Sequence, residues 1–149
     1  MRIEIVPRHA LASARYCEAL ELCVHAYDAD EDIVGIMRQF DRSTHVLLID
    51  AHERLVSHAL WIERWLIHRA NRIRSAYVEL VATDPKHQRH GHASAVMRAL
   101  GQAFVGFDIG ALSPSDPAFM PDLDGRHGAG RCSSSAQTAK RRALPPTKR

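Results

Sequence analysis

Apolar residues recur at strand-like spacing in five stretches of the chain. They alternate with polar residues, or form short branched runs, at 2–6, 44–50, 55–64, 73–83 and 107–112. Period-two alternation and branched apolar runs are typical of β-strands, so these stretches predict five strands. A tight turn at Ala51-His52-Glu53 separates the second strand from the third, and we expect this pair to form an antiparallel hairpin.

Three other stretches, 11–27, 33–40 and 94–104, place apolar residues at helical intervals. In the first of them these positions are Leu11, Ala14, Cys17, Leu20, Cys23 and Val24. The order of elements is therefore β-α-α-β-β-β-α-β. It predicts an α/β (α+β) fold with a mixed, mostly antiparallel sheet flanked by helices, in which one helix crosses between the last two strands.

The periodic pattern ends after Asp116. Residues 120–149 hold no periodic apolar run, and they include three consecutive serines at 133–135 and the pair Pro145-Pro146. We therefore expect one domain over residues 1–119, with its C-terminal strands missing, and an irregular, disordered tail over 120–149. A sheet that stops at 107–112 leaves the outer edge of its last strand unpaired.

Charge is distributed unevenly along the chain. Residues 1–125 carry 13 Lys and Arg against 17 Asp and Glu, whereas residues 126–149 carry seven cations and no acid. The pI of about 9.0 therefore results from the excess of basic residues in 126–149. A basic tail can bind nucleic acid or membrane phosphates, but this one has no aromatic residue for stacking and few apolar positions, which favours a solvated tail.

Length and composition narrow the class of protein further. With 149 residues, 46% hydrophobic and 25% charged, the chain suits one globular domain. No apolar run approaches the roughly 18–20 residues that cross a bilayer, and the N-terminus leads into a strand instead of a signal peptide, so we expect a cytoplasmic protein. Three cysteines without metal-like pairing argue against a disulfide framework, and Cys17 and Cys23 are expected to be buried in the first helix.

The candidate chemistry is concentrated where the strand over 73–83 leads through a turn and a polar loop into a helix. Gly91 lies at the centre of this loop, and Ala93 keeps the first helical turn free of bulk. Backbone N–H groups at a helix start converge on one point, and the helix dipole reinforces them, so the loop predicts an anion site. It is not a P-loop, because no Gly-Lys-Ser/Thr follows, and not a dinucleotide fingerprint, which needs three glycines.

Two further groups of side chains allow more than one interpretation. His87, His90 and His92 have the spacing H-x-x-H-x-H but lack a fourth ligand, so we expect no metal and interpret them as phosphate donors or exposed side chains. Trp61 and Trp65 are four residues apart and share one strand face. They either pack in the core, which we favour, or line an acceptor groove.

The motif Gln88-x-x-Gly91-x-Ala93, placed after a strand that ends in Val81-Ala82-Thr83, resembles the Gcn5-related N-acetyltransferase (GNAT) superfamily. From about residue 45 to 119, including SHALWIERWLIHRANRIRSAYVELVAT and the later GALS, the sequence is similar to the aminoglycoside 2′-N-acetyltransferase branch in particular. This resemblance covers about half of the chain. It implies a GNAT-like fold and acetyl-CoA as co-substrate.

The resemblance also implies a cofactor site. The strand backbone would bind the pantetheine arm and the acetyl carbonyl at Val81, Ala82 and Thr83. The loop would cradle the pyrophosphate with Gln88, Arg89, His90, Gly91, His92 and Ala93. A backbone N–H near Val81 would then serve as the oxyanion donor.

Glu79 is the candidate catalytic residue. By the same resemblance it would contact the substrate amine as a base, directly or through water. We expect Tyr77, Glu79 and Val81 to share one strand face beside the thioester, which favours this role over that of a solvent-exposed carboxylate.

Two more residues are candidates for contact with the acceptor. Ser113 matches a substrate-contacting serine of the resembled branch, although a plain loop serine is an equal alternative. Asp30 belongs to an acidic turn that lies where the branch faces a polycationic substrate. For this turn, formed by Asp28, Asp30, Glu31 and Asp32, we favour the simpler interpretation of a solvated surface.

The chain departs from the resembled family after its last predicted strand. The family continues with a helix whose tyrosine acts as acid toward the CoA thiolate, then Gly-Phe/Trp and more strands, but residues 120–125 read Met-Pro-Asp-Leu-Asp-Gly. Codons for 119–125 can be chosen so that the register one base earlier encodes Tyr-Ala-Arg-Leu-Gly-Trp. Our hypothesis is a one-base deletion near Phe119 that put the C-terminal part out of frame, and the nucleotide sequence tests it.

The function predicted from the sequence is an acetyl-CoA-dependent N-acetyltransferase, impaired by the missing C-terminal motif. Its expected partner is a small-molecule amine, in particular an aminoglycoside 2′-amine, with no metal, membrane or nucleic acid, and with a homodimer left open. One alternative is a non-catalytic CoA-binding remnant. Another is a nucleic-acid-binding module that uses Lys140-Arg141-Arg142 and Lys148-Arg149.

Overall fold

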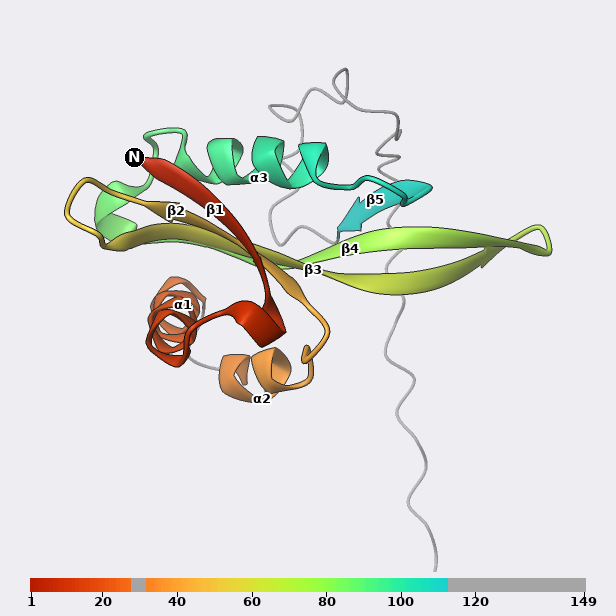
Figure 1. The fold of residues 1–149 in the computed structure, drawn as a ribbon, viewed down its shortest axis with the longest axis horizontal. Coiled ribbons are helices and arrows are strands. Elements are labelled where there is room, and N and C mark those ends of the chain that lie inside the picture. The colour runs from red at the N-terminus through yellow and green to blue at the C-terminus, as the bar shows by residue number, and fades with distance from the viewer. Residues whose placement is uncertain (28–31, 113–149) are drawn as a thin grey trace, which may run out of the picture.

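Five strands form a sheet in the spatial order β1-β2-β3-β4-β5 in the computed structural model, which describes residues 1–27 and 32–112 (Figure 1). They are β1 (Arg2–Pro7), β2 (Thr44–Ile49), β3 (Leu55–His68), β4 (Asn71–Thr83) and β5 (Ile109–Leu112). Neighbours run antiparallel from β1 to β4, whereas β5 lies parallel to β4. The predicted mixed, mostly antiparallel sheet is therefore confirmed. The tail expected over 120–149 and the hypothesis on residues 119–125 lie outside the described residues.

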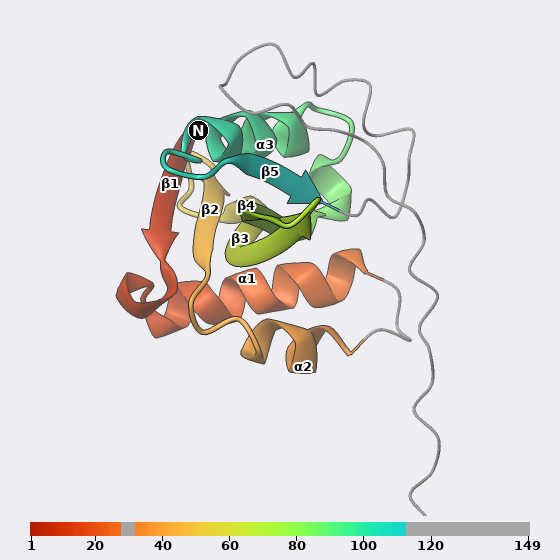
Figure 2. The same ribbon diagram turned by 90° about the vertical axis from the view of Figure 1, so that its right-hand side faces the viewer.

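Helices cover both faces of the sheet (Figure 2). α1 (Ser13–Ala26) and α2 (Ile33–Arg38) lie on one face, and α3 (His92–Gln102) lies on the other. Two short 3-10 helices, η1 (Arg8–Ala10) and η2 (Pro85–His87), follow β1 and β4. As predicted, α3 makes the crossover between the parallel strands β4 and β5. Within the described ranges, no helix has the length and apolar character needed to cross a membrane.

The core has one apolar layer on each side of the sheet. The layer toward α1 and α2 contains Leu22, Ile33, Met37, Leu47, Ile49, Leu60 and Ile62. The layer toward α3 contains Val46, Leu48, Val56, Trp61, Val78, Val96 and Leu100. Because both faces are covered, β2 is an apolar run without polar alternation.

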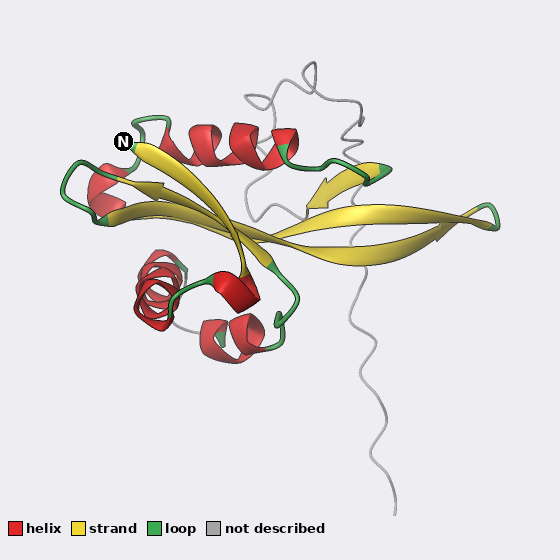
Figure 3. Cartoon of the chain, in the orientation of Figure 1, coloured by secondary structure: helices red, strands yellow, loops and turns green. Residues whose placement is uncertain are grey.

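β3 and β4 continue beyond the sheet as a two-stranded ribbon (Figure 3). Both strands are longer than the predicted 55–64 and 73–83, and they meet at Arg69 and Ala70, which have positive φ angles. The side chains from Glu63 onward in β3 are exposed. Strand pairing in the ribbon therefore leaves no pattern of alternating burial from which the sequence analysis could extend the strands.

The two tryptophans of β3 have different environments. Trp61 is buried in the α3-side layer, with its ring edge-on to Phe104 at 5.6 Å between centroids. Trp65 is 51% exposed on the ribbon, where the Arg72 guanidinium lies 4.6 Å from its ring centroid. The predicted core position is thus correct for Trp61 and wrong for Trp65, because the strand has left the sheet by that point.

α1 buries only part of the face that its periodicity predicted. Ala19, Leu22 and Cys23 are buried, whereas Cys17 and Val24 are exposed. The predicted burial is confirmed for Cys23 and wrong for Cys17. The sheet contacts the neighbouring stripe of the helix, and a helical position one residue away points about 100° to the side.

Candidate active site

β4 bulges near its C-terminal end. Leu60 pairs with Glu79 and His58 pairs with Ala82, so a step of two residues in β3 faces a step of three in β4. Leu80 lies within the longer step and has a φ of 51°, in the left-handed region. This irregularity is a β-bulge, which bends a strand and redirects its side chains. A residue with a Cβ is strained at such a φ and is rarely found there.

The bulge decides which face of the sheet the next residues occupy. Tyr77 packs toward α1, and Glu79 follows it on that face by strand alternation. Leu80 also packs toward α1, whereas Val81 packs in the α3-side layer. The prediction that Tyr77, Glu79 and Val81 share one face is therefore wrong for Val81, because one extra residue reverses the alternation.

β5 accompanies β4 only over part of its length. Their parallel pairing runs from Ser75 with Ile109 to Val78 with Leu112, where the described part of β5 ends. In the described ranges no strand lies beside residues 79–83 on this side. Within the described residues, the end of β4 therefore has an unpaired edge, and an extended ligand can hydrogen-bond to such an edge as a strand would.

Side chains hold four consecutive carbonyls at the end of β4. The bonds are His58 Nδ1 to Leu80 O at 3.1 Å, Tyr27 hydroxyl to Val81 O at 3.2 Å, Ser57 hydroxyl to Ala82 O at 3.0 Å, and Gln88 Nε2 to Thr83 O at 3.4 Å. The donors come from β3, from the end of α1 and from the loop after β4. The backbone that was predicted to bind the pantetheine arm is thus held in place from several directions.

The segment after β4 turns sharply by means of local hydrogen bonds. Asp84 Oδ1 accepts the Lys86 N–H at 2.8 Å, and the Asp84 carbonyl accepts the His87 N–H at 2.7 Å. Arg89 and Gly91 then have φ angles of 60° and 77°. These left-handed residues reverse the chain so that α3 starts immediately after the loop.

The N-terminal end of α3 has no side-chain cap. Gly91 is the N-cap residue, its carbonyl accepts the Ala95 N–H at 2.9 Å, and no acidic residue lies in the first turn. A Cβ built on Gly91 would meet no atom within 4 Å, so the space beside it is open. Uncapped N–H groups at the positive end of a helix dipole are suited to binding an anion.

Three imidazoles gather beside this helix start. His90 Nδ1 donates to the Gln88 carbonyl at 2.6 Å, and the His90 ring stacks on His92 with 5.8 Å between centroids. His87 Nδ1 lies 3.5 Å from Asp84 Oδ2. Burial, together with the charges of His90 and His87, lowers the pKa of His92. In the part of the chain that is described, no three His, Cys, Asp or Glu side chains form a group that could hold a metal ion.

Glu79 lies half-buried immediately before the bulge. Burial raises the pKa of its carboxyl, and the charge of Arg64 partly offsets this effect. Burial and the charge of Glu79 raise the pKa of Tyr77, two residues earlier. A carboxylate with a raised pKa is a better proton acceptor near neutral pH. A raised pKa and a half-buried position are what a general base requires.

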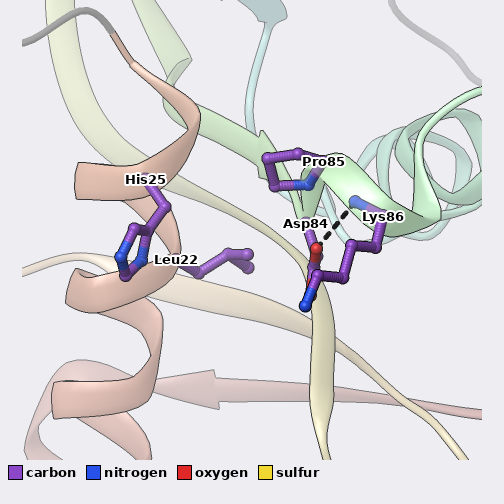
Figure 4. A pocket seen from close by; sticks show the side chains of 5 residues that line it. All are labelled: Leu22, His25, Asp84, Pro85 and Lys86. Atoms are coloured by element: carbon purple, nitrogen blue, oxygen red, sulfur yellow. Dashed lines mark hydrogen bonds between the residues drawn. The ribbon is translucent and has the colours of Figure 1, made fainter.

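A cavity of about 350 Å³ lies between the C-terminal part of α1 and the segment that follows β4 (Figure 4). It is lined by Leu22, His25, Asp84, Pro85 and Lys86. The cavity begins one residue past Thr83, so it adjoins the site without including Glu79. A carboxylate and an ammonium group both line it, and its charge therefore selects neither an anion nor a cation.

Two of the predicted acceptor-side residues, Asp30 and Ser113, lie outside the described residues. Within the acidic turn, Asp32 is described, and its Oδ1 accepts the Gly35 N–H at 2.8 Å. Asp32 is the N-cap of α2. Its carboxylate thus has the structural role of a helix cap, which is typical of Asp at this position.

The sequence analysis did not identify His45 and His58 as part of the site. Both side chains are completely buried, and they contact α1 through Tyr16 and Cys23. The available signal was a histidine at a core-facing position of an apolar strand, in THVLLI and in SHALW. Buried polar groups need partners, so these positions indicate a hydrogen-bonded network.

Comparison with known proteins identifies the family. Residues 11–123 match the family described as acetyltransferase (GNAT) domain. The match spans most of the chain and includes the bulge, the polar loop and α3. The chain therefore belongs to the GNAT acetyltransferase family, as the loop motif predicted.

Individual relatives agree with this assignment. The chain is 41% identical over 93 residues to the aminoglycoside 2′-N-acetyltransferase of Mycolicibacterium fortuitum. These aligned residues make up 61% of this chain and 44% of that protein. The chain thus spans less than half of this relative's length.

Solved structures share the fold. An acetyltransferase from Trypanosoma brucei matches with a TM-score of 0.60 and 18% identity, covering 99% of this chain and 98% of that one. An aminoglycoside antibiotic 6′-N-acetyltransferase from Acinetobacter haemolyticus matches with a TM-score of 0.60 and 14% identity, covering 96% and 100%. At these identities the likeness is one of fold.

Proposed function

We propose that this chain binds acetyl-CoA and transfers its acetyl group to an amine of a small molecule, and that an aminoglycoside 2′-amine is the acceptor. The observation that carries the proposal is the bulged free edge of β4, which leads through a short loop to the uncapped start of α3. The choice of acceptor is supported by the relative from Mycolicibacterium fortuitum, whose name specifies this amine.

The free edge of β4 suits the extended, amide-bearing pantetheine arm. Backbone groups of Val81, Ala82 and Thr83 follow the bulge, past the point where the described part of β5 ends. An extended amide chain can hydrogen-bond there as an added strand. The N–H groups of the first turn of α3, together with Gln88 and Arg89, would hold the diphosphate, and the absence of a side-chain cap at this helix start supports this role.

Bound acetyl-CoA would supply a thioester whose carbonyl carbon bonds to the amine nitrogen while the carbon–sulfur bond breaks and coenzyme A leaves as the thiolate, which takes a proton from water. Glu79 takes the proton that the amine nitrogen loses, directly or through one water, and its raised pKa supports this role. A backbone N–H of the bulge at Val81 donates to the developing oxyanion. Asp30 and Ser113 are the proposed contacts to the acceptor.

Two measurements test the proposal in sequence. Calorimetric titration with acetyl-CoA should show saturable binding, and the backbone NMR signals of 81–83 and 91–93 should move. A thiol-release assay with acetyl-CoA should then produce free thiol only when kanamycin or tobramycin is added.

The outcomes separate the competing functions. A folded sample that does not bind acetyl-CoA contradicts the proposal as a whole. Binding without thiol release for any amine contradicts the catalytic part and supports the non-catalytic CoA-binding alternative.

A further inference from the structure

A row of buried polar side chains crosses the sheet beneath the bulge. Ser43 is followed by His45 on β2 and by His58 on β3, and the row ends at the carbonyl of Leu80 on β4. The successive distances are 3.1 Å, 2.9 Å and 3.1 Å. Ser43 is 3% exposed and both histidines are 0% exposed. The row is therefore shielded from water along its whole length.

The carbonyl at the end of the row sets the direction of every hydrogen bond in it. A carbonyl oxygen can only accept, so His58 carries its hydrogen on Nδ1 and offers the bare Nε2 to its neighbour. His45 must then donate from Nδ1, which leaves its own Nε2 to accept from the Ser43 hydroxyl. Both imidazoles are therefore neutral Nδ1–H tautomers, and all four of their nitrogens have partners.

The surroundings of the row exclude a direct chemical role. Cys23 Sγ lies 3.5 Å from His58 Nδ1, but burial raises the pKa of this thiol to about 12, so it is not a nucleophile. Burial lowers the pKa of His45 to about 4, with a smaller contribution from the charge of Arg8. Burial and the neighbouring His45 lower the pKa of His58 to about 3. None of these groups reaches solvent, so none can meet a substrate.

The row ends at a residue whose backbone lies in the left-handed region. Leu80 is a leucine with positive φ, and such strain persists only where the surrounding structure holds it. Without the bulge, β4 would continue in regular register against β3, and the residues from Val81 onward would change faces. The backbone of 81–83 would then have a different orientation relative to Glu79.

We propose that His45 and His58 are positioning residues that hold the Leu80 carbonyl toward α1 and thereby keep the β4 bulge in the form that receives the pantetheine arm. This inference rests on the proposed function for its effect on acetyl-CoA. The His45–His58 pair acts through the Leu80 backbone and does not touch the substrate.

The first test reads the tautomers in the free protein and needs no ligand. Long-range nitrogen–proton NMR spectra of imidazole-labelled protein at pH 7 should show His45 and His58 with a protonated Nδ1 and a bare Nε2. The Nε2–H form, which is usual for exposed histidines, should be found for His68 on the ribbon turn. An Nε2–H form or rapid exchange at His58 contradicts the inference.

The second test compares two replacements of the same side chain. His58→Asn keeps an N–H donor near the Nδ1 position, whereas His58→Leu removes it. We expect His58→Leu to shift the backbone signals of residues 79–83 and to weaken acetyl-CoA binding tenfold or more, and His58→Asn to recover most of the binding. His68→Leu, on the exposed turn, is the control and should change neither.

Further outcomes keep the inference falsifiable. Should His58→Leu not fold, His45→Leu takes its place, because it leaves His58 Nε2 without a donor and should free its tautomer and move the same backbone signals. A folded leucine variant with unchanged signals at 79–83 contradicts the inference. If the unmodified chain does not bind acetyl-CoA, the proposed function fails, and the tautomers and the signals at 79–83 still decide whether the pair holds the bulge.

Discussion

The Tyr27 hydroxyl donates a hydrogen bond of 3.2 Å to the carbonyl of Val81, and so connects the C-terminal end of α1 with the bulge of β4. Tyr27 is the last residue before the acidic turn, and Val81 is the first residue of the predicted pantetheine site. This hydrogen bond thus joins the helix to the strand edge that we propose as the pantetheine site. A substitution at Tyr27 should therefore alter the backbone at Val81.

Replacing Tyr27 by Phe removes this donor and leaves the Val81 carbonyl without it. We expect a loss of about 0.5–1.5 kcal/mol in the free energy of unfolding, the usual contribution of one hydrogen bond. Acetyl-CoA binding should weaken severalfold. Tyr16→Phe also removes one hydroxyl from α1 and keeps the ring contacts of Tyr16 with Arg8 and His45, so it serves as the control in urea unfolding and calorimetry. Equal effects of the two variants on binding would contradict the coupling.

Glu79→Gln should abolish most of the transfer while leaving the cofactor bound. Loss of a general base typically lowers the rate by about 10²–10⁴, and the amide keeps the size of the side chain. Glu63→Gln is the matched control, because Glu63 lies on β3 and forms an exposed ion pair with Arg74. Initial rates of thiol release and the dissociation constant for acetyl-CoA are to be measured for both. If Glu79→Gln retains the full rate, Glu79 is not the base.

The pH dependence of transfer should respond to Arg64. A base must be deprotonated, so activity falls as pH falls through the pKa of Glu79, which burial places above its ordinary value of 4.5. Arg64 lowers this pKa, and Arg64→Gln should therefore move the acid limb of kcat/KM to higher pH. The shift should be small and should decrease with salt, because Arg64 is exposed. A shift to lower pH would contradict the assignment of the limb to Glu79.

Gly91→Ala should lower the free energy of unfolding, whereas Gly101→Ala in the same helix should raise it. Gly91 has a φ of 77°, so a Cβ there costs about 1–2 kcal/mol and occupies space beside the proposed diphosphate. Gly101 lies inside α3 with open space around it, and alanine should stabilise it by about 0.5–1 kcal/mol. Urea unfolding measures both values. Only Gly91→Ala should weaken acetyl-CoA binding.

Acid should unfold the domain through the buried His45–His58 pair. Their pKa values of about 4 and about 3 lie below the ordinary 6.5, so between these limits the unfolded chain binds more protons and stability falls as pH falls. Each histidine contributes a slope of up to about 1.4 kcal/mol per pH unit. Glu79 opposes this, since its raised pKa makes the folded state bind its proton more tightly.

The slope of unfolding free energy against pH identifies the groups responsible. We expect the free energy of unfolding, measured with denaturant between pH 6.5 and 4, to depend less steeply on pH in His45→Asn than in the unmodified protein. The difference in slope should correspond to the uptake of about one proton fewer on unfolding. His68→Asn, which changes an exposed histidine on the ribbon, should leave the slope unchanged. If the unmodified protein, His45→Asn and His68→Asn all show the same slope, other groups cause the acid sensitivity.

Much of the architecture was accessible from the order of residues. The apolar spacing predicted the five strands and the three α-helices that are described but neither 3-10 helix, and the loop around Gly91 indicated an anion site before any fold was known. The errors have a common cause. Cys17, Trp65 and Val81 were placed by extending a period, and in each case a neighbouring element, the end of the sheet or an extra residue changed the face.

Local periodicity and loop composition are short-range properties, so the sequence alone was enough to predict the mixed α/β fold and a candidate anion site in the loop around Gly91. The bulge depends on which residues of β3 meet β4, and the row from Ser43 to Leu80 joins positions on three strands. Such contacts exist only after the sheet has formed. Only the tertiary structure shows that His45 and His58, which lie in two apolar strands, are joined by a hydrogen bond. Only the tertiary structure shows that this row ends at the Leu80 carbonyl, next to the proposed pantetheine site.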